Sequence, residues 1–176
     1  VVVLDHSVAE LTNCVTQGNR LGLDVVTSSS TVLKGTVSSS QNGNGVDING
    51  TSIVELRGAR VELNGNAGYG LFAGSGSHVA IFGFQASQGS TLTTNGNGFA
   101  GIILSSGILT AYVPAVISAS NNTFGLFLSD GGIVAPDGAT TFLIDNNTVG
   151  MSVLRGSQLH IVGGLTVQAN GTGVLA

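Results

Sequence analysis

Residues 42–64 read NGNGVDINGTSIVELRGARVELN, and this stretch decides the fold because Gly and Asn separate three short apolar runs. Asp47, Glu55 and Glu62 each have an apolar residue on both sides. A period of two is typical of a half-buried strand, and the intervening Gly and Asn residues would interrupt any helix. We therefore predict three short strands joined by tight turns in this stretch.

The same pattern recurs along the chain. Its polar loop triplets begin at Gln17, Asn42, Asn64, Asn95, Asn121, Asn146 and Asn170, which gives spacings between 22 and 31 residues. A repeat of this length is the signature of stacked supersecondary units. Three strands per repeat predict an all-β solenoid of about 6–7 coils, with a core of stacked aliphatic side chains and a ladder of loop asparagines. The longest repeat favours a protruding loop at residues 85–89.

Composition excludes several classes of partner. Only 8% of the 176 residues are charged, and the nine acids outnumber the five bases, for a net charge of −4. Nucleic-acid binding requires a basic surface, so we expect no nucleic-acid partner. No apolar run approaches the roughly 18 residues of a transmembrane helix, so we expect no membrane span. His pairs and Cys-His sets at zinc-binding spacing are absent, and we expect no bound cofactor.

The chain is short enough for a single domain over residues 1–176, with repeated coils at 17–176. Residues 1–16 have two interpretations: a partial coil in which Leu11 aligns with Leu56, or a cap in which residues 7–10 are a capping box that opens a short helix. The last residues fall inside a predicted first strand. Because an uncapped coil invites pairing with another chain, we expect a fragment of a longer protein, or oligomerisation through its open ends.

The loops, corners and strands together resemble a known superfamily. NGNG loops, single-glycine corners such as Gly35 and Gly58, and strands of the form VxL are similar to those of the pectate-lyase-like superfamily over residues 17–176. The resemblance implies a right-handed, single-stranded parallel β-helix with three short strands per coil. It does not imply one activity, because the superfamily includes lyases, hydrolases, epimerases, tailspikes and proteins without a known reaction.

Enzymes of this superfamily use acidic and basic groups in a groove along one sheet. Counting back from the second strand of each coil places Asp24 over Asp47 on the outside of the first sheet, whereas counting from the loops offsets them by two residues. A stacked pair could serve acid catalysis or hold Ca²⁺, and Arg20 is the base nearest to that face. Two solvated surface carboxylates are the alternative. The acid pairs and basic motifs of polygalacturonases are absent. If the chain is an enzyme, the resemblance to pectate lyases, which carry calcium-binding acids and an arginine on neighbouring coils, implies Asp24, Asp47 and Arg20 as the remnant of that catalytic set.

Outward aromatic residues indicate an interaction surface on the second sheet. If Ile81 and Ala111 point inward, Phe82 and Tyr112 point outward on adjacent coils, with Val162 at the equivalent place further along. An exposed apolar strip favours a polysaccharide, a protein surface or a second copy of the chain as partner, and packing beneath a loop is the alternative.

Two functions therefore stay open. The first is a noncatalytic extracellular or cell-surface rod, bacterial and adhesin-like, or a carbohydrate-recognising module. The second is a polysaccharide lyase, hydrolase or epimerase domain with an acidic groove.

Overall fold

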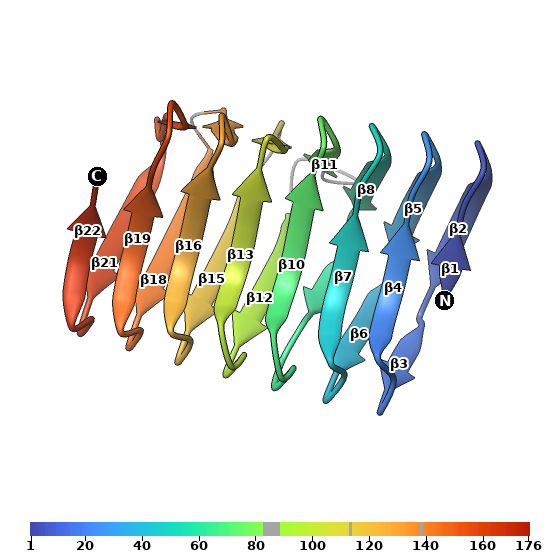
Figure 1. The fold of residues 1–176 in the computed structure, drawn as a ribbon, viewed down its shortest axis with the longest axis horizontal. Helices are drawn as coiled ribbons and strands as arrows, with labels where there is room; N and C mark the ends of the chain where they lie inside the picture. The colour runs from blue at the N-terminus through green and yellow to red at the C-terminus, as the bar shows by residue number, and fades with distance from the viewer. Residues whose placement is uncertain (83–88, 113, 138) are drawn as a thin grey trace.

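The chain forms a rod of three parallel β-sheets (Figure 1). The structure is a computed structural model that describes residues 1–82, 89–112, 114–137 and 139–176. These residues contain 22 strands and no helix. Each coil contributes one strand to every sheet, and about seven turns stack along the axis. In Figure 1 the strands of the first sheet run upward at the front and the chain returns behind them while advancing to the left, so the coil is right-handed.

The first sheet faces the viewer in Figure 1 and has eight strands. Their bounds are β1 Val2–Val3, β4 Leu21–Val25, β7 Asn44–Ile48, β10 Tyr69–Gly74, β13 Ala100–Ser105, β16 Phe124–Ser129, β19 Val149–Val153 and β22 Thr172–Leu175. Most are five or six residues long, longer than the runs of alternating residues in the sequence. The polar loops are accordingly shorter than predicted, and Gly45 lies inside β7 rather than in a loop.

The second and third sheets have seven strands each. The second consists of β2 Val8–Thr12, β5 Ser30–Lys34, β8 Ile53–Arg57, β11 His78–Phe82, β14 Ile108–Ala111, β17 Ile133–Pro136 and β20 Gln158–Leu159. The third consists of β3 Val15–Gln17, β6 Thr36–Ser40, β9 Arg60–Glu62, β12 Ser90–Asn95, β15 Ala115–Ser120, β18 Thr140–Asp145 and β21 Gly164–Gln168. Of the predicted loop at residues 85–89, residues 85–88 lie outside the described residues.

Two features at the ends of the strands agree with the sequence analysis. Gly35 and Gly58 turn the chain sharply between the second and third sheets, with φ of 62° and 57°. These left-handed values favour glycine, which has no Cβ to clash. At the start of the chain, Leu11 pairs with Leu33, which pairs with Leu56. Residues 1–16 therefore form a coil of the solenoid, and the helical-cap interpretation is wrong.

Aliphatic stacks run the length of the rod and form its core. In the first sheet one inward row consists of Leu23, Val46, Leu71, Ile102, Leu126 and Met151, all at most 3% exposed. Each residue lies directly over its counterpart because parallel strands pair about 4.8 Å apart. The inward side chains of one coil therefore cover those of the next, as the repeat predicts.

A ladder of buried asparagines joins the third sheet to the first. Asn42, Asn66, Asn97, Asn122 and Asn147 are at most 4% exposed. Asn97 is typical: its Oδ1 accepts hydrogen bonds from the backbone and side-chain nitrogens of Asn66, and its Nδ2 donates to Leu63 O and Asn122 Oδ1. Buried polar groups that are fully paired stabilise a fold, so the predicted ladder is confirmed as a structural element.

A row of glycines follows the ladder inside the first sheet. It consists of Gly22, Gly45, Gly70, Gly101, Gly125 and Gly150. A Cβ at Gly70 would lie 2.8 Å from the carbonyl oxygen of Gly101, and the other glycines have equivalent contacts with the next coil. Side chains larger than hydrogen do not fit at these distances, so this row lets the coils pack at strand spacing.

No helix among the described residues is long and apolar enough to cross a membrane.

Candidate functional site

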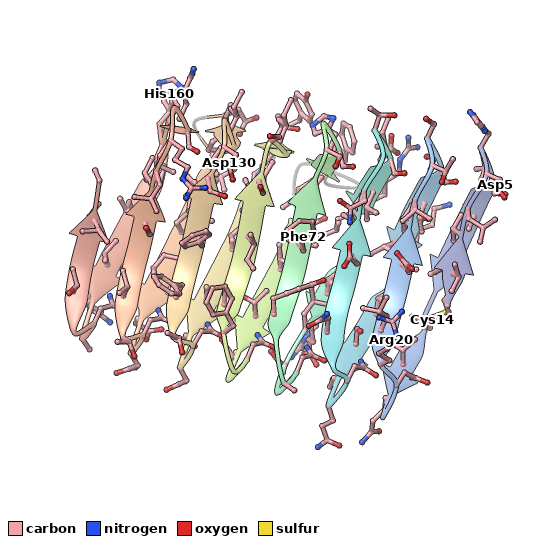
Figure 2. All side chains as sticks on the ribbon, in the orientation of Figure 1. Asp5, Cys14, Arg20, Phe72, Asp130 and His160 are labelled. Atoms are coloured by element: carbon pink, nitrogen blue, oxygen red, sulfur yellow. The ribbon has the colours of Figure 1, made fainter. Side chains whose placement is uncertain are left out.

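The outer surface of the first sheet carries acidic, aromatic and aliphatic side chains, and we call it the first-sheet face (Figure 2). Its central row places one outward side chain on each successive strand. In register from β4 to β16, these are Asp24, Asp47, Phe72, Ile103 and Phe127. The face is therefore acidic toward the N-terminal end and apolar beyond it.

The acidic end holds the two aspartates expected to stack. Asp24 and Asp47 are partners on β4 and β7, so the count from the second strand gives the correct register and the count from the loops does not. Both side chains are half-buried. Burial, together with the neighbouring Asp47 carboxylate, raises the pKa of Asp24, and the positive charge of Arg20 partly offsets this effect. The pair therefore favours a proton, or a cation, between its members.

Asp47 is held in place by two neutral donors. The Tyr69 hydroxyl donates to its Oδ2, and the Asn49 side-chain amide donates to its Oδ1. Burial and the hydrogen bond to Asp47 raise the pKa of the Tyr69 hydroxyl, so the phenol keeps its proton. Neither donor was predicted from the sequence. Asn49 directly follows β7 and reaches Asp47 within the same coil, whereas Tyr69 begins β10 and is brought to the carboxylate by the pairing of adjacent coils.

Arg20 lies in the turn before β4, at the edge of the acidic pair, and is exposed. Within the part of the chain that the structure describes, it forms no ion pair with either aspartate. The four ion pairs found there instead join Lys34 to Glu10, Arg57 to Glu55, Arg60 to Glu62 and Arg155 to Asp130. Arg20 therefore acts on Asp24 through the electrostatic field rather than through contact.

Five aromatic rings form the apolar part of the first-sheet face. Tyr69 and Phe72 on β10 have ring centroids 5.5 Å apart. Further along, Phe124 packs at 5.1 Å from Phe127, and Phe99 lies 5.4 Å and 6.1 Å from these two rings. Phe99 is 44% exposed and the other rings are half-buried. The sequence analysis missed this cluster, although Phe99 and Phe124 each come directly after a polar loop, which is a usable signal.

A polar groove runs beside the aromatic cluster. It has a volume of about 490 Å³ and is lined by the turns before the first-sheet strands, including Asn121, Thr123, Asn146 and Thr148. Thr123 immediately precedes Phe124, so amide and hydroxyl groups lie at the edge of the rings. An extended ligand on this face would meet aromatic surface and hydrogen-bonding groups together.

Two of the three residues predicted to form an apolar strip on the second sheet, Phe82 and Tyr112, are in contact. Phe82 and Tyr112 stack with centroids 5.1 Å apart, and the Arg57 guanidinium lies 5.7 Å from the centroid of Phe82. Tyr112 is 52% exposed and Val162 is 57% exposed. Val162 lies two coils beyond Tyr112 without touching it, so this strip offers two rings, whereas the first-sheet face offers five.

Metal ligands are few. Among residues 1–82, 89–112, 114–137 and 139–176, no three His, Cys, Asp or Glu side chains come close enough together to hold a metal ion. In the described part of the chain, Asp24 and Asp47 are the only carboxylates at the expected Ca²⁺ site, whereas Ca²⁺ takes about 6–8 oxygen ligands.

Comparison of the chain with family models, with curated proteins and with solved structures gives no match. The geometry of the face is therefore the basis for assigning a function.

Proposed function

We propose that the chain is a noncatalytic rod that recognises carbohydrate on its first-sheet face and acts outside the cell or at the cell surface. The observation that carries this proposal is the set of five partly exposed aromatic rings: two on β10, two on β16, and Phe99 in the turn before β13. Soluble proteins rarely expose contiguous apolar surface without a binding role. We also propose membership of the pectate-lyase-like superfamily, on the basis of the three parallel sheets and the left-handed corner residues.

Sugars suit this face for two reasons. The C–H groups on one side of a pyranose ring pack against an aromatic ring, while its hydroxyls require polar partners at the edge. The phenylalanines supply the first kind of contact, and Thr123, Asn121 and Asn146 in the adjoining groove supply the second. Because the rings belong to successive coils, a polysaccharide lying along the axis would contact several of them at once.

The test is oligosaccharide binding by paired variants. A glycan screen identifies ligands, and titration calorimetry then compares wild type with Phe127→Ala on the first sheet and Tyr112→Ala on the second. We expect Phe127→Ala to weaken binding about tenfold, as loss of one stacking contact does, and Tyr112→Ala to leave it unchanged. The opposite result would move the site to the second sheet, and failure of every glycan to bind would refute the proposal.

A second candidate, a polysaccharide lyase, hydrolase or epimerase, is favoured by the register of Asp24 over Asp47. The strand spacing of about 4.8 Å is close to the roughly 5 Å that separates the two carboxyl groups of retaining glycosidases. Asp24, with its raised pKa, would be the acid, and Asp47, held by Tyr69 and Asn49, the ionised partner. Arg20 would contact the substrate. Turnover of a uronate or neutral polymer that Asp24→Asn and Asp47→Asn each abolish, with the fold intact, would establish this alternative over the first.

A further inference from the structure

The first-sheet face has a charge pattern that restricts the kind of glycan it can bind, an inference that rests on the proposed function. Residues 69–74, 99–105 and 124–129, which carry its apolar part, contain no Asp, Glu, Lys or Arg. Its two carboxylates without an ion-pair partner among the described residues lie at one end, where Asp24 and Asp47 are partners on β4 and β7, whereas Asp130 at the turn after β16 is paired with Arg155.

Among the described residues neither carboxylate forms an ion pair, although the charges of Arg20 and the N-terminal ammonium act on Asp24 through space. Four of the five Lys and Arg side chains are paired with other acids, on the second and third sheets or at the Asp130 turn. Arg20, the fifth, is exposed and makes no ion pair with either aspartate among the described residues. Two like charges on adjacent strands repel each other, so a positive group placed between them would gain energy from both.

Aromatic rings border the same place. Phe72 is the register partner of Asp47 on the next strand, and its ring lies 5.5 Å from that of Tyr69. The face of an aromatic ring attracts a cation. A positive group over Asp47 would therefore meet carboxylate oxygens on the β4 side and aromatic rings on the β10 side, whereas a carboxylate-bearing sugar would be repelled by both.

We propose that the ligand is a polysaccharide with free amino groups, a polymer that contains unacetylated amino sugars. An ammonium group lies against Asp24 and Asp47 beside Phe72, and uncharged ring faces of the following sugars pack on Phe99, Phe124 and Phe127. Neutral sugars use the aromatic part and the adjoining polar groove without the acidic end, and polyuronates are excluded by charge.

Titration calorimetry with four hexameric probes tests this assignment: glucosamine, N-acetylglucosamine and galacturonate hexamers, and hexalysine. We expect wild type to bind the glucosamine hexamer about tenfold more tightly than its N-acetylated counterpart, because ion-assisted contacts add roughly this much, and to bind the galacturonate hexamer least. This preference should weaken as salt is added.

Charge variants then locate the source of the preference. The double variant Asp24→Asn with Asp47→Asn loses the contact with the ammonium group and should bind the glucosamine and N-acetylglucosamine hexamers equally. Glu62→Gln, on the third sheet, removes one negative charge elsewhere and should keep the preference. Circular dichroism and thermal unfolding check that each variant is folded.

The outcomes separate this inference from the function on which it rests. If the N-acetylated or galacturonate hexamer binds as tightly as the glucosamine hexamer, the ammonium assignment is wrong and the carbohydrate-binding rod stands. If hexalysine binds as tightly, the acidic end recognises ammonium groups in general and the amino-sugar assignment is wrong. If no saccharide binds at all, the proposed function itself is refuted.

Discussion

The two sides of the first sheet are built from the same strands and differ in how strictly they repeat. On the inner side, the aliphatic row from Leu23 to Met151, the glycine row and the asparagine ladder keep the same chemistry from coil to coil. On the outer side, the central row changes from Asp24 to Phe72 to Phe127. Repetition marks what the rod needs to stack, and departure from repetition marks where a ligand can be recognised.

The largest expected difference between the core of the rod and the first-sheet face comes from a pair of phenylalanines, one in each place. Phe142 is 0% exposed in β18, and Phe127 is half-buried on the first-sheet face. Removal of a buried ring leaves a cavity, so Phe142→Ala should lower the free energy of unfolding by about 4 kcal/mol. Phe127→Ala loses partly exposed ring contacts and should cost about 1 kcal/mol. Urea unfolding measures both, and equal losses would show that the outer ring is part of the core.

The second prediction concerns the asparagine ladder. Asn97→Ala leaves the backbone N–H of Asn66 and the carbonyl of Leu63 without their buried partners. Unpaired buried groups cost roughly 1–3 kcal/mol each, so we expect a loss of about 3 kcal/mol in urea unfolding. Asn121→Gly is the control because Asn121 is exposed with φ of 58°, a value that glycine also adopts. The effect of Asn121→Gly should stay within about 0.5 kcal/mol. A loss as large as that of Asn97→Ala would mean that the buried ladder stabilises the rod no more than an exposed loop asparagine does.

The third prediction separates steric contact from backbone conformation at two glycines. Gly70→Ala forces a Cβ to within 2.8 Å of Gly101 O and should cost about 2 kcal/mol. Gly65→Ala has open space around its Cβ but a φ of +64°, which costs an L residue about 1 kcal/mol. Thermal unfolding compares the two variants. If Gly65→Ala were the more damaging, backbone conformation would limit stability more than the close approach of the coils at the repeated glycines.

The smallest expected effect is a gain in the free energy of unfolding, and it concerns Asp24. Its pKa is raised in the fold, chiefly by burial and then by Asp47, so the native state binds more protons than the unfolded chain between the usual and the raised pKa. The free energy of unfolding therefore falls as pH rises through this window, and the loss persists at neutral pH.

Asp24→Asn cannot ionise, and at pH 7 it should equal or exceed wild type in stability by less than about 1 kcal/mol, because solvent screens a half-buried group. The advantage should disappear near pH 3. Urea unfolding at both pH values measures it. A variant that is less stable than wild type at pH 7 would mean that the Asp24 carboxylate stabilises the rod instead.

Much of the inner side could be predicted from the sequence because its chemistry is periodic. The loop triplets gave the coil length, Gly35 and Gly58 were recognised as corners, and the loop asparagines as a ladder. These features depend on spacing within a repeat, which a single sequence displays directly. Outside the inner side, the stacking of Asp24 on Asp47 was only one of two registers that the sequence allowed, and the pairing of β4 with β7 decides between them.

The outer aromatic cluster could not be predicted in the same way, because strict alternation fails inside the first-sheet strands. In β10 both Gly70 and Leu71 are buried, so Tyr69 and Phe72 point outward. These two residues are three positions apart, and strict alternation would place them on opposite faces of the strand. The glycine that causes this shift looks like part of a turn in the sequence. Its place within the strand depends on the carbonyl of the adjacent coil, which only the stacked structure reveals.

The asparagine ladder also bears on how such a rod can change in length. Successive amides from Asn97 to Asn122 and from Asn122 to Asn147 are 25 residues apart and make identical bonds. A tandem duplication of one such segment would supply its own amide, its own inward row and its own outward strand. The rod would grow by about 4.8 Å and its ligand-facing surface by one position, without redesign of the neighbouring coils.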